Sequence, residues 1–229
     1  MTLRAMRSLI LVVAVFLGGC RVDALTPVNL ADIDKVATAK QSIEATARLL
    51  LTFSSGQWCE DLGASLVVVL KSSGLNMAAV SCAKDPESAE WHGELRMPVR
   101  IVSDENAGAA SGELALLAVK ADAGKPGALS IVAHLDGPRL NAARERLVSL
   151  AAARDSGDAS TLDLTVIILI RNDLAKDAIL AVNAMTTETD PQVVLPAGGA
   201  RAVTLSKAGM EKLLQEQAVE FLSIEYTAN

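Results

Sequence analysis

The chain has 229 residues, of which 51% are hydrophobic and 3% aromatic, and its formal net charge is −6 at pH 7. An acidic surface repels phosphate, which makes nucleic acid and anionic headgroups poor electrostatic partners. The scarcity of aromatic rings argues against a stacking platform for bases or sugars. The length suffices for one large domain or two small ones.

The first twenty residues have the pattern of a bacterial export signal. Arg4 and Arg7 precede an uninterrupted apolar run over residues 9–17. This run is too short to span a bilayer, which needs about 20 apolar residues. It closes with Leu17-Gly18-Gly19-Cys20, where small residues leave the backbone accessible to a peptidase and the thiol can take a diacylglycerol. The segment closely resembles the bacterial lipobox.

The lipobox resemblance implies that residues 1–19 are a signal peptide and that Cys20 becomes the lipidated mature amino terminus, carrying palmitate-type chains. Mature lipoproteins of this class usually carry three acyl chains, which exceed the two signals needed for stable membrane anchoring. In this class an aspartate after the cysteine favours the inner membrane, so Arg21 favours the outer membrane, with the domain facing the periplasm. The alternative is a buried helix, although the run has no polar face to make it amphipathic.

The chain contains three cysteines, so acylation of Cys20 leaves Cys59 and Cys82. In an oxidising envelope two remaining cysteines most simply form a disulfide, which would stabilise the fold by roughly 3 kcal/mol. The alternative is a pair of free thiols. A redox pair fits worse, because the spacing is far from Cys-x-x-Cys.

Residues 20–41 are expected to be a lipidated terminus and tether, interrupted at most by a short helical turn over residues 30–36 that Asn29 could cap. Apolar residues then alternate from Ile43 to Phe53, a period of two that predicts a half-buried strand. From Trp58 to Leu70 the spacing becomes helical, and a short strand is expected around Met77 to Cys82.

The clearest strand covers Ala89 to Val102, where apolar residues alternate with charged ones. Pro98 cannot donate a hydrogen bond, so we expect a sheet edge or a bulge there. Two strands at 114–121 and 128–135 should form a hairpin, and Pro138 suits the first turn of a helix.

The strand at 161–171 is apolar on both faces and is therefore expected to be central in the sheet. After a turn at Asn172, residues 178–185 are expected to run back. Two further short strands, 193–195 and 202–205, flank Pro-Ala-Gly-Gly and predict another hairpin.

Ser206 is a good N-cap for a helix that precedes a last strand at 221–226. Together these elements predict an α+β fold, a mostly antiparallel β-sheet with about three helices packed on it. We expect one periplasmic domain over residues 42–229, with two subdomains divided near 136–160 as the alternative.

Candidate catalytic and metal-binding residues are few. His92 lies between Glu90 and Glu94 on one strand face, and this trio could bind a divalent cation. The more ordinary interpretation is an exposed polar face, so no metal site is assigned.

Two other pairs of polar residues are weaker candidates for a catalytic site. His134 and Asp136 could form a dyad, but no Gly-x-Ser-x-Gly motif supplies a nucleophile. Asp32 and Asp34 are better explained as solvated carboxylates than as a catalytic pair. We therefore expect no enzyme and no cofactor.

Several stretches in order resemble uncharacterised lipoproteins encoded by prophages and tailed phages of Gram-negative bacteria. They are TPVNLADI after the lipobox, the cysteines at 59 and 82, RMPVRIV, TLDLTVIILIRNDLAKDAILAVNAM and VTLSKAGMEKLL. The resemblance covers most of the mature chain and implies export, lipidation, the disulfide and a shared fold, without assigning catalytic residues.

Together these observations predict a lipid-anchored, non-enzymatic module that binds a protein or envelope component. The phage resemblance implies a role in altering the host envelope, for example by excluding superinfecting phage. The alternative is a carrier of an apolar ligand, which would need a well-formed apolar pocket open to solvent.

Overall fold

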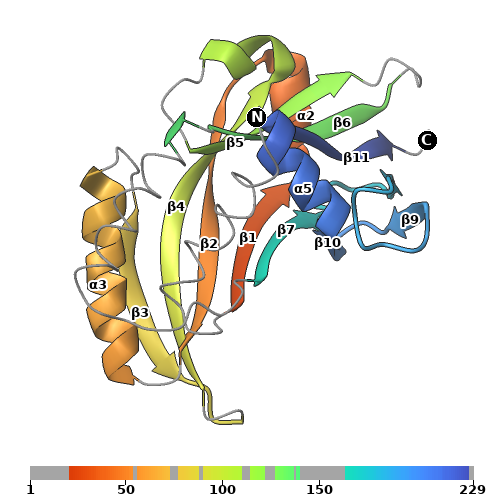
Figure 1. Ribbon diagram of the computed structural model, residues 1–229. Coiled ribbons are helices and arrows are strands. Elements are labelled where there is room, and N and C mark those ends of the chain that lie inside the picture. The colour runs from red at the N-terminus through yellow and green to blue at the C-terminus, as the bar shows by residue number, and fades with distance from the viewer. Residues whose placement is uncertain are drawn as a thin grey trace. The chain divides into compact units, whose positions relative to one another are not determined.

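A computed structural model describes residues 21–53, 56–72, 77–87, 90–109, 114–121, 127–136, 138–139 and 163–226. These residues form mostly β-sheet, with three helices (Figure 1). Ten strands are hydrogen-bonded in the order β10-β7-β1-β2-β4-β5-β6-β11-β8-β9, and β3 pairs with β4 beside this path. Sheet predominates over helix, which refines the expected balance of the two.

The described residues divide into two compact units that alternate along the chain. Unit 1 takes its described residues from 21–24, 48–97, 138–139 and 163–165, and unit 2 takes the rest. The chain passes between the units near residue 137, but it also does so at four other places. A single boundary near 136–160 therefore does not describe the division.

Unit 1 is built from the second half of β2 (Ile43–Phe53), α3 (Gly56–Ser72), β3 (Ala78–Lys84) and the first half of β4 (Trp91–Ser103). The helix α3 packs along β3, which pairs antiparallel with β4 (Figure 1). All four elements were predicted from the sequence, and their presence is confirmed.

Pro98 marks the point at which β4 changes partner. Up to Arg96 the strand pairs antiparallel with β3, and from Arg100 it pairs parallel with β5. A proline that donates no hydrogen bond suits this gap between two ladders. Pro98 was expected at a sheet edge or a bulge; it lies instead between two ladders on one side of β4, where β5 replaces β3 as the partner.

Unit 2 contains most of β1 and all the elements from β5 onwards except the start of β7. The helix α2 packs against β5, and α5 packs against β11 and β6. The bounds are β1 (Arg21–Asn29), α2 (Leu30–Ala39), η1 (Asp104–Ala109), β5 (Ala115–Ala121), β6 (Leu129–Leu135), β7 (Asp163–Arg171), β8 (Ala178–Val182), β9 (Gln192–Leu195), β10 (Ala200–Thr204), α5 (Lys207–Glu216) and β11 (Ala218–Tyr226).

The core of unit 2 is aliphatic. The helix α2 buries Leu30, Ile33 and Val36 completely, and Phe221 on β11 is also fully buried. Removing such side chains from water provides the main driving force for folding. The predicted hairpin of β5 and β6 is confirmed, as is the non-edge position of β7 between β10 and β1.

The tether predicted for residues 20–41 is wrong over residues 21–29, whereas the helical turn expected at residues 30–36, with Asn29 at its N-cap, is confirmed within α2. Residues 21–29 form β1 and residues 30–39 form α2, and Val28 on the strand is 2% exposed. Val28, Leu30, Ile33 and Val36 are buried, so this segment contributes to the core rather than forming a solvated chain.

Two predicted strand pairings are also wrong. β8 does not run back along β7; it pairs with β9 and β11, while β7 pairs with β10. Consequently β9 and β10 do not form a hairpin with each other across residues 196–199. They are the two end strands of the sheet order, and this short connection joins them.

Candidate functional site

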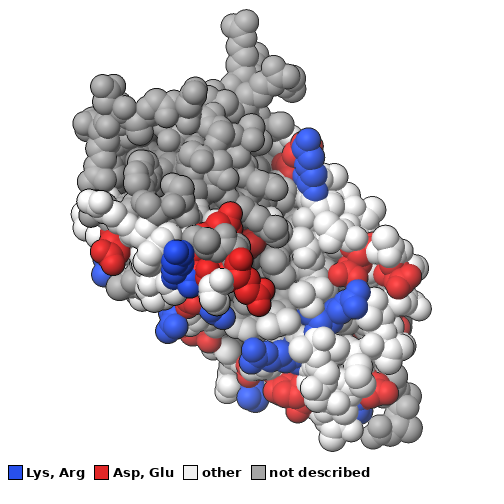
Figure 2. All heavy atoms as spheres, turned by 90° about the horizontal axis from the view of Figure 1, so that it is seen from below, with Lys and Arg blue, Asp and Glu red and all other residues white. Residues whose placement is uncertain are grey.

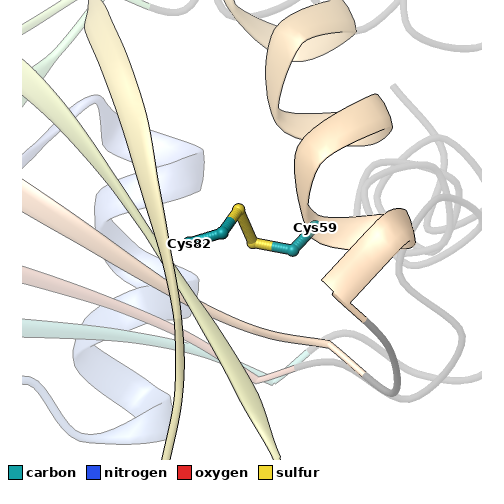
Figure 3. The surroundings of a disulfide bond; sticks show 2 residues. All are labelled: Cys59 and Cys82. Carbon is teal, nitrogen blue, oxygen red and sulfur yellow. A yellow bond between two sulfur atoms is a disulfide. The ribbon is translucent and has the colours of Figure 1, made fainter.

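The disulfide is the best-defined covalent feature of unit 1 (Figure 3). Cys59 on α3 is joined to Cys82 on β3, with an S–S distance of 2.07 Å and a Cα–Cα distance of 6.1 Å. The predicted bond is confirmed. Cys59 is fully buried, so the bond ties the helix to the sheet rather than offering a reactive thiol.

Glu94 is the centre of the polar face of unit 1. Its carboxylate accepts hydrogen bonds from Arg48 Nη2 at 2.5 Å and from Arg96 Nε at 2.7 Å. The hydrogen bond from Arg48, followed by that from Arg96, lowers the pKa of Glu94 below its ordinary value. A carboxylate held by two guanidinium groups is poorly available as a metal ligand.

His92 faces different partners from those that a metal site would require. Its Nε2 lies 3.5 Å from a carboxylate oxygen of Asp85, and its Nδ1 lies 3.4 Å from Thr52 Oγ1. Within the described ranges, no three His, Cys, Asp or Glu side chains are grouped closely enough to hold a metal ion. The structure therefore does not assemble Glu90, His92 and Glu94 into a metal site.

His134 lies on β6 in unit 2. Its Nε2 is buried and has no hydrogen-bond partner among the described residues, and burial lowers the pKa of the ring. The backbone N–H of Asp136 donates to the carbonyl of Leu114 at 2.8 Å. His134 Nε2 therefore makes no hydrogen bond to Asp136 of the kind that orients a catalytic base.

A second polar cluster, which the sequence did not indicate, joins β5, β6 and β11. Ser130 Oγ donates to Glu220 Oε1 at 3.3 Å, and Lys120 Nζ lies 3.2 Å from Glu220 Oε2. Ser130 is 1% exposed, so its hydroxyl is out of reach of a substrate. The cluster links three strands. Ser130 and Glu220, which are joined by a hydrogen bond, lie 90 residues apart in the sequence.

The amino terminus of α2 is capped from a distance. Asn29 occupies the N-cap position but makes no side-chain capping bond. Instead, Asp173 Oδ1 accepts a hydrogen bond from the backbone N–H of Ala31 at 2.9 Å. A carboxylate at a helix amino terminus is favoured by the exposed N–H groups and the helix dipole.

Asp32 is engaged locally. It accepts from Asn29 Nδ2 at 3.1 Å and pairs with Lys35 Nζ at 3.3 Å. Asp34 lies exposed on the same helix. These contacts agree with the interpretation of Asp32 and Asp34 as helix-surface carboxylates.

Asn172 organises the loop that follows β7. The residue is 1% exposed, and its Nδ2 donates to the carbonyls of Lys176 and Leu195, each at 2.9 Å. Its Oδ1 accepts from the N–H of Leu174 at 3.2 Å. The amide thus satisfies buried backbone groups that would otherwise be costly to leave unpaired.

The loop also covers Tyr226 at the end of β11. Lys176 Nζ lies 4.8 Å from the ring centroid of Tyr226, within the range of a cation–π contact. Burial, followed by the nearby carboxylates of Asp34 and Asp173, raises the pKa of Tyr226 to about 12. The hydroxyl is buried without a hydrogen-bond partner among the described residues.

Charges of both signs are interspersed on the face shown in Figure 2. Among the described residues, surface ion pairs include Lys40 with Glu105 at 2.5 Å and Arg201 with Glu188. Such exposed pairs typically contribute little to stability. On this face the described side chains form no continuous basic surface of the kind that binds nucleic acid.

Cys20 lies outside the described residues, and β1 begins at the next residue, Arg21. None of the helices in the described part of the chain has the length and apolar character needed to cross a bilayer. Comparisons find no matching family model, no matching curated protein and no matching solved structure.

Proposed function

We propose that this chain is a lipid-anchored envelope protein that presents an α+β domain to the periplasm and acts as a non-enzymatic binding module. One observation carries the proposal: a lipobox-like segment ends at Cys20, directly before the first strand of the fold. The bond between Cys59 and Cys82 supports the same compartment, because disulfides persist in oxidising environments. Arg21 favours the outer membrane.

The use of polar side chains supports binding rather than catalysis. Glu94, Asp173 and Glu220 each accept hydrogen bonds from neighbouring side chains or backbone groups. Such bonds fix strands and a helix in place. The resemblance to prophage lipoproteins extends the proposal to a modifier of the host envelope that excludes superinfecting phage.

Mass spectrometry of the native chain, compared with Cys20→Ser, tests the anchor. We expect an acylated Cys20 at the mature amino terminus and membrane fractionation that is lost in the variant. A mature chain without acyl mass, or a Cys20→Ser chain that still fractionates with membranes, would overturn the anchor. Recovery of a bound apolar small molecule from the purified chain would favour the carrier instead.

Expression in a phage-sensitive host tests the envelope role. We expect lower plaque counts with the native chain and normal counts with Cys20→Ser, which is exported without its anchor. Equal plaque counts at equal protein level, across phages with different receptors, would contradict superinfection exclusion while leaving the anchor unaffected.

A further inference from the structure

The junction between the proposed anchor and the fold has no spacer. The strand β1 begins at Arg21, immediately after Cys20, and is drawn at the red end of the colour scale in Figure 1. Residues 21–24 belong to unit 1, and unit 2 begins at Leu25 in the same strand. Both units therefore start within five residues of the proposed acylated cysteine.

The distance between the anchor and the fold is much shorter along β1 than it would be along a flexible tether. A strand advances about 3.3 Å per residue, so the first residue of unit 2 lies within about 17 Å of the anchor along β1. A flexible tether over residues 20–41 would instead have had a root-mean-square reach of about 25 Å and a much longer maximal reach. Because β1 is paired within the sheet, it cannot act as a free linker.

We infer that the fold is seated directly on the bilayer that carries its anchor, so that the lipid headgroup surface is its nearest partner. This inference rests on the proposed lipidation of Cys20. A module held in this way cannot reach across the periplasm.

Charge makes the inference testable. The chain is acidic, with a net charge of −6 that becomes more negative once Arg4 and Arg7 are removed with the signal peptide. An anionic bilayer repels such a domain at low salt, and the repulsion is screened beyond about 10 Å at 0.1 M ionic strength. A domain joined to its anchor through β1 cannot move away from the bilayer, whereas a domain on a flexible linker can.

The test uses the full lipidated chain, purified from membranes and placed in phosphatidylcholine vesicles that contain a dansyl-labelled headgroup lipid. The donors are the two tryptophans, Trp58 and Trp91, which both lie in unit 1. One variant carries a 20-residue Gly-Ser linker, about 25 Å in mean reach, between Cys20 and Arg21. The matched control carries the same insert after Asn229.

We expect strong energy transfer from the native chain and the control, unchanged when phosphatidylglycerol is added at low salt. The linker variant should lose at least half of the transfer, lose more on phosphatidylglycerol vesicles, and regain it when salt is added. Equal transfer from the native chain and the linker variant would overturn the inference. So would a native signal that depends on salt.

Mass spectrometry of the same samples separates the two proposals. A chain without acyl mass on Cys20 would overturn the proposed anchor, and the seating with it. An acylated chain with weak transfer would overturn the seating alone.

Discussion

The two units fix their helices by different means. In unit 1, a covalent bond between Cys59 and Cys82 joins α3 to β3. In unit 2, α2 receives its cap from Asp173, and α5 is capped by Ser206 Oγ, which accepts from the N–H of Gly209 at 3.2 Å. The comparison teaches that unit 1 depends on the redox state of its compartment, whereas unit 2 depends on close packing and on polar residues remote in sequence.

The largest effect is expected from breaking the covalent link. Replacing Cys59 and Cys82 together with alanine should lower the free energy of unfolding by about 3 kcal/mol, because the unfolded chain is no longer constrained. Tryptophan fluorescence during urea denaturation reports this loss, since Trp58 and Trp91 both lie in unit 1.

Cys20→Ser is the matched control, because it removes a cysteine without touching the bond. Hydrogen exchange of β6 and β11 should remain slow in the double variant. An equal loss of protection from hydrogen exchange in both units would show that unit 2 also depends on the disulfide.

Unit 2 should be most sensitive at Gly209. A Cβ at this position would lie 2.3 Å from the carbonyl oxygen of Met185 and 2.8 Å from the side chain of Leu205. Gly209→Ala should therefore destabilise unit 2 by about 2 to 3 kcal/mol, as overpacking does, measured by urea denaturation. The sign of this stability change distinguishes a crowded site from an open one, because replacing glycine with alanine in an unhindered helix would stabilise the protein by about 1 kcal/mol. Glu211→Ala, at an exposed position of α5, should change little.

Asn172 tests the polar support of unit 2. Asn172→Ala would leave the part-buried carbonyl of Lys176 and the buried carbonyl of Leu195 without this donor, at a cost of about 2 kcal/mol. Asn106→Ala provides a control, since that side chain donates one hydrogen bond, to Ser103 Oγ. Hydrogen exchange and urea midpoints measure the stability of both variants. Similar losses of stability for Asn172→Ala and Asn106→Ala would contradict the role assigned to Asn172.

Local patterns in the sequence predicted the elements that local physics determines. The alternation in β2 and β4 follows from one face being buried, and the start of α5 follows from the capping chemistry of Ser206. The disulfide could be predicted because assigning Cys20 to lipidation left two cysteines in a chain that was expected to be exported. No distant contact had to be known in these cases.

The errors have a common cause in contacts between distant residues. β1 lies between β7 and β2 although it contains Pro27, which argues against an internal strand. The turn at 196–199 reverses the chain, but its sequence does not choose the partners of β9 and β10. The cap that Asp173 supplies to α2 comes from 142 residues away. None of these partners leaves a local signal.

The smallest effect at neutral pH is expected for Tyr226→Phe. The hydroxyl has no partner among the described residues, so its removal sacrifices no hydrogen bond, and the change at pH 7 should be below about 0.5 kcal/mol. Above pH 10 the variant should differ from the native chain. The folded pKa of Tyr226 is about 12, whereas an unfolded tyrosine ionises near 10.

Between these values the unfolded chain binds fewer protons than the folded one, so stability falls as pH rises. Tyr226→Phe removes this contribution and should flatten the alkaline limb of the stability curve. Tyr226 is the single tyrosine of the sequence, so phenolate absorbance reads its pKa directly. Parallel stability curves for the two proteins, or a native phenolate titration near pH 10, would contradict the burial of this ring. A flattened alkaline limb in Tyr226→Phe would show that the packing around Tyr226 stabilises unit 2. The disulfide could not cause this change, because it lies in unit 1 and does not titrate.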